Sequence, residues 1–134
     1  MCRFNNMSLI TTLKHDHEEI FRLLDECRAL GVATDEGRRK LKQVRGVVVA
    51  HLAREDHKLY PAMQKHDATR ALGDMYAQEM RAMSAEIIGF FDSLDSGRAG
   101  IEFAREIGRV ISHLRQRMTR EEVRLYPAFE AHCE

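Results

Sequence analysis

HLAREDHKLYPAMQKH, from His51 to His66, is repeated near the other end of the chain as RMTREEVRLYPAFEAH, from Arg117 to His132. The two segments align without gaps, and seven of the sixteen positions are identical, including Glu55 with Glu121 and the run Leu-Tyr-Pro-Ala. Two copies are too few for a solenoid. They indicate a bundle made of two related helix hairpins, in which the second and fourth helices occupy equivalent places.

Apolar residues recur at helical spacing along the whole chain and predict four long amphipathic helices. We place these helices at residues 8–30, 35–66, 69–94 and 98–131. Residues that cap or end helices stand at the predicted boundaries: Ser8, Gly31, Thr34 or Asp35, Thr69, and the run Asp95-Ser96-Gly97. Long helices joined by short loops pack antiparallel. The sequence therefore predicts an all-α, up-down-up-down four-helix bundle that forms a single domain over residues 1–134.

The composition suits a soluble globular protein, since 44% of the 134 residues are hydrophobic and 31% are charged. Lys plus Arg and Asp plus Glu each number 21, so the formal net charge is zero. We expect neither nucleic acid nor an anionic membrane as a partner, because both require clustered basic residues. No apolar run has transmembrane length, and no signal-peptide hydrophobic region begins the chain. Three cysteines at no metal-ligand spacing fit reduced thiols, so we expect a cytoplasmic protein.

Four ionisable residues lie on or beside the predicted apolar faces. His51 and Glu55 are four residues apart, which places an imidazole and a carboxylate one helical turn apart on the same face. His17 borders the apolar stripe of the first helix, and Glu121 takes the place of Glu55 in the second repeat. Burying these groups uncompensated would cost several kcal/mol per charge, and a metal cation removes that cost. The alternative is a hydrogen-bonded polar layer or a set of ion pairs between helices.

These residues resemble the metal-binding motifs of the hemerythrin-like HHE family. The matching segments are Leu13-Lys-His-Asp-His17-Glu-Glu-Ile20, His51-x-x-x-Glu55 followed by Leu-Tyr-Pro, and Glu121 followed by the second Leu-Tyr-Pro. The resemblance covers nearly the whole chain. It implies a bundle that holds two irons bridged by carboxylates and serves in oxygen or nitric oxide binding, iron handling, redox sensing or iron–sulfur repair. It implies that His17 and His51 ligate one iron and that Glu55 and Glu121 bridge both.

The second iron position departs from the family pattern. The third predicted helix contains no histidine, and the positions that face the centre there are Met80 and Met83, with Tyr76, Glu79 and Ser84 close by. On the fourth helix the repeat places Arg117 where the family has a histidine. His113 lies one turn earlier and further from the apolar stripe, which favours a surface or supporting role. We therefore expect that the second metal site, as the family builds it, is missing.

Arginine is permanently cationic and presents a planar fork of donors that fits carboxylates. We hypothesise that Arg117 neutralises Glu121 and Glu55 in place of the second ion, leaving a single-metal site of two histidines and two carboxylates. Iron is the metal that the resemblance favours, and zinc and manganese also suit such ligands. If Arg117 satisfies both carboxylates, the site binds no metal.

Two functions of different classes are consistent with this site. The first is a metal-binding protein with a sensing, redox or metal-handling role, with dioxygen or nitric oxide as a small ligand. The loss of one iron weakens the case for reversible dioxygen binding, which uses the pair in this family. The second is a metal-free regulatory or interaction module on the same scaffold, with an unknown protein partner. An enzyme is the less favoured interpretation, because no substrate pocket can be inferred from the sequence.

Overall fold

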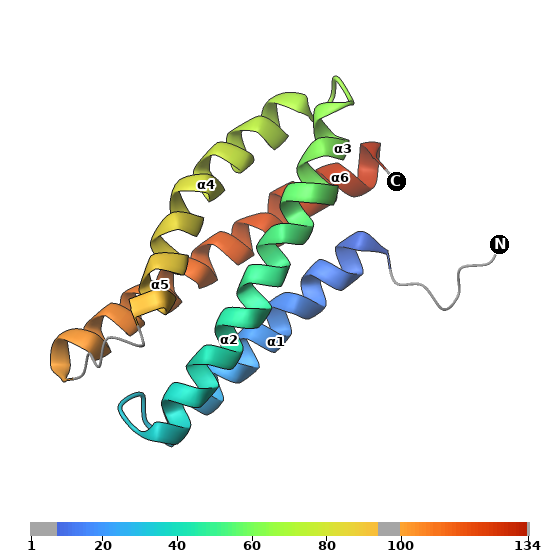
Figure 1. Cartoon of the computed structure of the whole chain (residues 1–134). Coiled ribbons are helices and arrows are strands. Elements are labelled where there is room, and N and C mark those ends of the chain that lie inside the picture. Colours follow the sequence, from blue (N-terminus) through green and yellow to red (C-terminus); the bar gives the residue numbers. More distant parts are fainter. Residues whose placement is uncertain (1–7, 94–99, 134) are drawn as a thin grey trace.

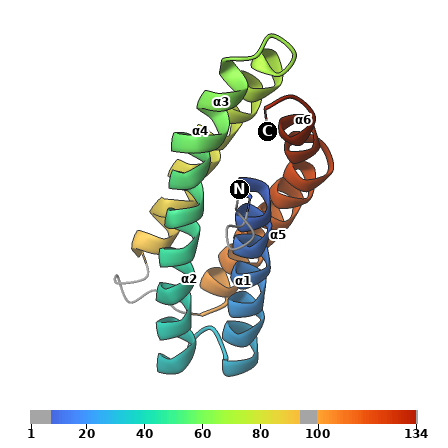
Figure 2. The same cartoon turned by 90° about the vertical axis from the view of Figure 1, so that its right-hand side faces the viewer.

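Four helical segments account for nearly all of the chain that this computed structural model describes, residues 8–93 and 100–133. Their elements in chain order are α1 (Leu9–Leu30), α2 (Asp35–Arg54), η1 (Glu55–Leu59), α3 (Tyr60–Gln64), α4 (Arg70–Asp92), α5 (Ile101–Arg120), η3 (Glu121–Leu125) and α6 (Tyr126–His132). Elements α2, η1 and α3 form one continuous segment, as do α5, η3 and α6 (Figure 1). The described ranges contain no strand. Consecutive segments run in opposite directions (Figure 1, Figure 2), which confirms the predicted up-down-up-down bundle.

The helix boundaries agree with the predicted ones to within a few residues. Ser8 and Thr34 each accept a hydrogen bond from the backbone N–H three residues on, and Gly31 ends α1 with a φ of 94°. The second segment ends at Gln64 and not at residue 66. Thr69 precedes α4, but its hydroxyl donates to a carbonyl at the end of the second segment and does not cap α4. The predicted break at residues 95–97, and the predicted helix ends at 94 and 98, lie outside the described residues.

Each segment buries one apolar face, and together these faces form the core. The core residues of α1 are typical, with exposures of 0–2% for Ile10, Leu13, Ile20, Leu23 and Leu24. Each such side chain contributes about 1.5–3 kcal/mol relative to an exposed one. Among the residues that the structure describes, six polar or charged ones are buried within this apolar interior: His17, His51, Glu55, Thr69, Arg117 and Glu121. Five of these six are residues that the sequence singles out for the site.

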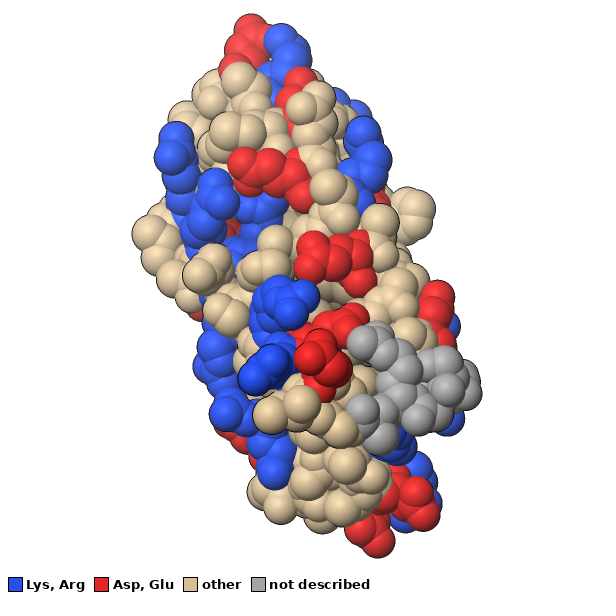
Figure 3. Space-filling view, turned by 90° about the vertical axis from the view of Figure 1, so that its left-hand side faces the viewer, with Lys and Arg blue, Asp and Glu red and all other residues tan. Residues whose placement is uncertain are grey.

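The surface carries charges of both signs. Basic side chains form a band along one edge of the face in Figure 3, and acidic side chains occupy its middle. This mixture agrees with the equal numbers of basic and acidic residues in the sequence. Among the described helices, none combines the length and the apolar composition that a membrane span requires.

Candidate metal centre

Glu55 and Glu121 each occupy the first position of a π-helical segment. In such a turn the N–H of a residue bonds to the carbonyl five residues back, as Tyr60 does to Glu55 and Tyr126 does to Glu121. A proline follows each tyrosine, and its ring has no N–H and crowds the carbonyl four residues earlier. Both copies of the repeat therefore widen the helix at the same place, and each begins this turn with a buried glutamate.

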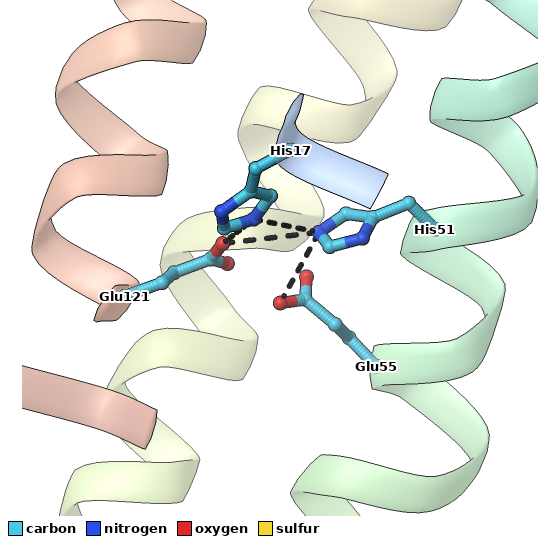
Figure 4. Close-up of side chains that lie close together, drawn as sticks. All are labelled: His17, His51, Glu55 and Glu121. Atoms are coloured by element: carbon cyan, nitrogen blue, oxygen red, sulfur yellow. Dashed lines mark hydrogen bonds and ion pairs between the residues drawn. The ribbon is translucent and has the colours of Figure 1, made fainter. Parts of the chain in front are cut away.

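Two histidines and two glutamates converge in the middle of the bundle (Figure 4). Nε2 of His17 on α1 lies 3.2 Å from Nε2 of His51 on α2 and 3.1 Å from Oε1 of Glu121. Nε2 of His51 lies 3.5 Å from Oε2 of Glu55. One candidate ligand atom from each residue lies within 4.8 Å of the other three, and each residue is only 1% exposed. The structure thus brings together the four residues that the sequence predicts as ligands.

Carboxylates outside this cluster hold both imidazole rings by their other nitrogen. Nδ1 of His17 lies 2.6 Å from Oε2 of Glu122, and Nδ1 of His51 lies 3.0 Å from Oδ2 of Asp16. Asp16 also accepts a hydrogen bond from Nη1 of Arg54 at 2.7 Å. A carboxylate at Nδ1 retains the proton there and leaves the Nε2 lone pair directed into the cluster. Histidines that ligate metals are held in this way.

The two buried carboxylates of the cluster need a positive charge to balance them. Burial and the neighbouring charge of Glu121 raise the pKa of Glu55. Burial alone would also raise the pKa of Glu121, but hydrogen bonding with the His17 and His51 rings lowers it in the metal-free protein. Burial would lower the pKa of His51, but hydrogen bonds to the surrounding carboxylates, with that to Asp16 the strongest, raise it to about 11. A proton on His51 therefore supplies positive charge in the metal-free protein, and a bound cation would replace it.

Tyr126 closes one side of the cluster. Its hydroxyl donates to Oε2 of Glu55 at 2.9 Å and lies 3.2 Å from Oε1 of Glu121. The other two carboxylate oxygens, Glu55 Oε1 and Glu121 Oε2, are buried and have no hydrogen-bond partner within the described part of the chain. Two imidazole nitrogens and two carboxylates with free oxygens are a ligand set that suits iron, manganese or zinc. The residues present therefore fit a metal ion.

A family comparison agrees with this geometry. The chain matches the model of the hemerythrin HHE cation binding domain over residues 8–129, a range that includes the whole cluster. The chain belongs to this family. Membership confirms the resemblance seen in the motifs, and together with the His/Glu cluster it indicates a metal-binding site. No curated protein and no solved structure matched the chain.

Arg117 makes a different contact from the one predicted for it in this hemerythrin-family site. Its Nη1 donates to Oε2 of Glu79 on α4 at 2.8 Å, whereas no ion pair joins it to Glu55 or Glu121 in the described part of the chain. The same carboxylate of Glu79 also pairs with Arg120 at 3.5 Å. This pairing leaves both cluster carboxylates free to hold an ion.

Of the other residues predicted near the second iron position, two contact Arg117 and two do not. Tyr76 and Met80 touch Arg117, whose guanidinium carbon lies 5.0 Å from the ring centroid of Tyr76 and whose Nε lies 2.6 Å from Sδ of Met80. Met83 is half-buried against the apolar core. His113 pairs with an exposed glutamate of α4 at 3.5 Å, and its side chain is 39% exposed. His113 is therefore a surface residue and not part of the cluster.

The contacts around Arg117 repeat those around His51. On α1 and α2, Asp16 bridges His51 and Arg54, which lies three residues further on. On α4 and α5, Glu79 bridges Arg117 and Arg120, which likewise lies three residues further on. The inner contact differs, because His17 meets His51 in one half and Met80 meets Arg117 in the other. The second half of this hemerythrin-family bundle thus keeps one acidic supporting contact, that of Glu79, but presents no imidazole.

The sequence did not lead us to three residues that support the cluster: Asp16, Glu122 and Tyr126. Asp16 and Glu122 stand directly beside His17 and Glu121, and adjacent helical residues point about 100° apart. In a regular helix they therefore point away from the faces that carry His17 and Glu121. In the structure each reaches sideways to an imidazole on another helix. An acidic residue next to a predicted ligand was the available signal.

Asp16→Asn is expected to weaken metal binding about 10- to 100-fold, because the uncharged amide holds the His51 ring less firmly and makes it a weaker ligand. The dissociation constant is measured by competition with a chelator of known affinity. Asp25→Asn is the matched control, since Asp25 is an exposed acidic residue of the same helix that pairs with Arg115. Equal affinities for the two variants would show that Asp16 does not support the site.

Proposed function

We propose that this single-domain bundle binds one iron ion through His17, His51, Glu55 and Glu121 and uses it in sensing, redox chemistry or metal handling. The observation that carries the proposal is the meeting of two buried imidazoles, with their Nε2 atoms 3.2 Å apart and each Nδ1 against a carboxylate. Two nitrogen lone pairs directed at one point repel each other unless a positive charge lies between them. When bound, iron would supply redox chemistry and would bind a small ligand such as dioxygen or nitric oxide.

The residues of this chain have separate tasks in the proposed site. His17 and His51 donate nitrogen lone pairs, while Glu55 and Glu121 supply negative charge. The hydroxyl of Tyr126 holds one oxygen of each carboxylate in place. Because the ligands come from α1, α2 and the two π-helical segments, an ion ties three helical segments together. The loading or oxidation state of the ion can therefore change how the helices pack, which suits a sensor.

A single ion is favoured over a pair because the second half of the bundle offers Met80 and Arg117 where the first offers His17 and His51. A thioether is a weak ligand for iron, and a guanidinium repels a cation. Zinc and manganese also suit the two nitrogens and two carboxylates. Iron is proposed because the family resemblance implies it.

A metal-free regulatory or interaction module is the second candidate. It is favoured by the contacts of His51, whose imidazole lies 3.0 Å from Asp16 and 3.5 Å from Glu55. These carboxylates raise the pKa of His51 to about 11, so a proton there can balance charge in the cluster without an ion. In that case Arg117 and Glu79 form a neutral pair in place of a second metal.

Elemental analysis of natively purified protein, together with an absorption spectrum, tests the proposal. We expect about one iron per chain and no absorption from an oxo-bridged iron pair. One zinc or manganese per chain would change the metal but retain the site. Fewer than about 0.2 ions per chain would leave only the metal-free module, since a site built for an ion should retain it through purification.

A further inference from the structure

A surface groove of about 360 Å³ lies between α4 and the segment made of η1 and α3, and none of the four cluster residues lines it. These two helical walls run in opposite directions (Figure 1). One wall presents Asp56, Tyr60 and Gln64, and the other presents Ala77, Arg81 and Ser84. Residues three or four apart share one face of a helix, so each wall is a single stripe along its segment.

Asp56 and Arg81 bring opposite charges to this groove. At its upper end, the amide of Gln64 donates a hydrogen bond of 2.8 Å to Asp74, which sets the register of the two walls. Asp56 comes eight residues before Gln64, and Arg81 comes seven residues after Asp74, so the two charged residues stand at similar heights on facing walls. Both are exposed, and neither forms an ion pair with the other or with another residue that the structure describes.

Apolar surface and a hydroxyl complete the lining. The side chains of Tyr60, Pro61 and Ala77 supply the apolar surface. Tyr60 is only 3% exposed, so the core holds it in a fixed place. Ser84 lies one turn beyond Arg81 on the same wall, and its hydroxyl can donate or accept a hydrogen bond. The groove therefore suits a molecule that combines an apolar part with groups of both charges.

The two charges restrict which small molecules fit. A simple carboxylate would be attracted by Arg81 but repelled by Asp56, and a simple amine would meet the reverse. A free α-amino acid carries an ammonium and a carboxylate on the same carbon, so it can pair with both side chains at once. Pockets for small molecules begin at about 300 Å³, so this groove is large enough for one amino acid.

We infer that this groove binds a free α-amino acid with an apolar side chain, whose ammonium donates to Asp56, whose carboxylate accepts from Arg81 and whose side chain packs on Tyr60. The site is separate from the proposed metal site, because its residues do not belong to the His/Glu cluster. A bound amino acid joins α4 to η1, so it should raise the melting temperature of the protein.

L-leucine is the probe, and its binding to the full chain is measured by isothermal titration calorimetry. L-leucine amide lacks the carboxylate and N-acetyl-L-leucine lacks the ammonium, so we expect each to bind about tenfold more weakly than L-leucine. Asp56→Asn and Arg81→Gln should weaken L-leucine binding by a similar factor. Asp25→Asn and Arg105→Gln are the controls, since both change exposed residues that form ion pairs elsewhere on the surface.

Pairing each variant with one analogue assigns the two contacts. Asp56→Asn should bind L-leucine and N-acetyl-L-leucine equally weakly, because the ammonium has lost its partner in that variant. Arg81→Gln should likewise not distinguish L-leucine from L-leucine amide. Both substitutions are at exposed positions, so the variants should fold and should melt at the temperature of the parent in the absence of ligand.

The results also separate this site from the proposed function. L-leucine that does not bind at millimolar concentration, or that binds no better than its two analogues, would overturn the amino-acid site, and so would variants that retain the affinity of the parent. None of these results would touch the metal site, whose ion content is measured on the same samples. Protein that binds L-leucine in the expected way but retains no ion would instead overturn the proposed function and leave the amino-acid site standing.

Discussion

His51→Ala is expected to abolish metal binding and to lower the melting temperature by on the order of 10 °C. The substitution removes one of two nitrogen ligands and also the imidazole that contacts both cluster carboxylates. Two buried acids then lose their compensating charge, whether an ion or a proton on His51 supplied it. Metal content is measured by elemental analysis and stability by thermal unfolding. His57→Ala is the matched control, since His57 is an exposed histidine only six residues further along the same segment.

A chelator separates the contribution of the ion from that of the imidazole. Metal that binds only the folded state adds to its stability, so chelation should lower the melting temperature of the parent protein and of His57→Ala. The same treatment should leave His51→Ala unchanged, because that variant has no ion to lose. A parent protein whose melting temperature and metal content do not respond to the chelator would contradict the proposed metal site and favour the metal-free module.

The repeat in the sequence explains why the fold and the inner cluster could be predicted. Helical periodicity identifies buried faces, and the alignment of Glu55 with Glu121 places both carboxylates at the same depth in the bundle. A ligand that lies on an apolar face is visible in sequence, because its polarity conflicts with its neighbours. His51 was recognised in this way, and the structure buries it beside Glu55 and His17.

The remaining features depend on geometry that periodicity does not carry. The π-helical segments shift the helix by one residue in the turn before Pro61 and Pro127, so a regular helix would misplace the side chains beyond that turn. Asp16 acts on a histidine of another helix, and nothing in its own helix indicates that partner. The partner of Arg117 was predicted wrongly for a similar reason. The sequence places Glu79 on the third helix. Only the packing of α4 against α5 shows that Glu79, and not a cluster carboxylate, forms the ion pair with Arg117.

The second half of the bundle resembles the first in one acidic contact but offers no imidazole where the first has His17 and His51. Glu79 pairs with Arg117 on its outer side, as Asp16 on α1 does with His51. One oxygen of each cluster carboxylate has no hydrogen-bond partner among the described residues. The inner side chains differ, because Met80 and Arg117 stand where the first half has His17 and His51. If the supporting contacts are sufficient, restoring two imidazoles should restore a site without any change of backbone.

The double substitution Met80→His with Arg117→His is therefore expected to raise the metal content from about one to about two ions per chain. Glu79 would then face the introduced imidazole at position 117, and the free oxygens of Glu55 and Glu121 would complete the ligand set. Arg117→His alone supplies one nitrogen and removes the repelling charge, so we expect weaker uptake of the second ion.

Met75→His with Arg117→His is the control, because Met75 lies on α4 with 39% exposure and cannot bring its imidazole inward. Iron-loaded double variant should also show absorption from an oxo-bridged pair if both ions share the carboxylates. A double variant that folds but binds no more metal than the parent would mean that the two halves are equivalent only in their outer contacts, and that the inner positions of α4 and α5 do not converge on a common point.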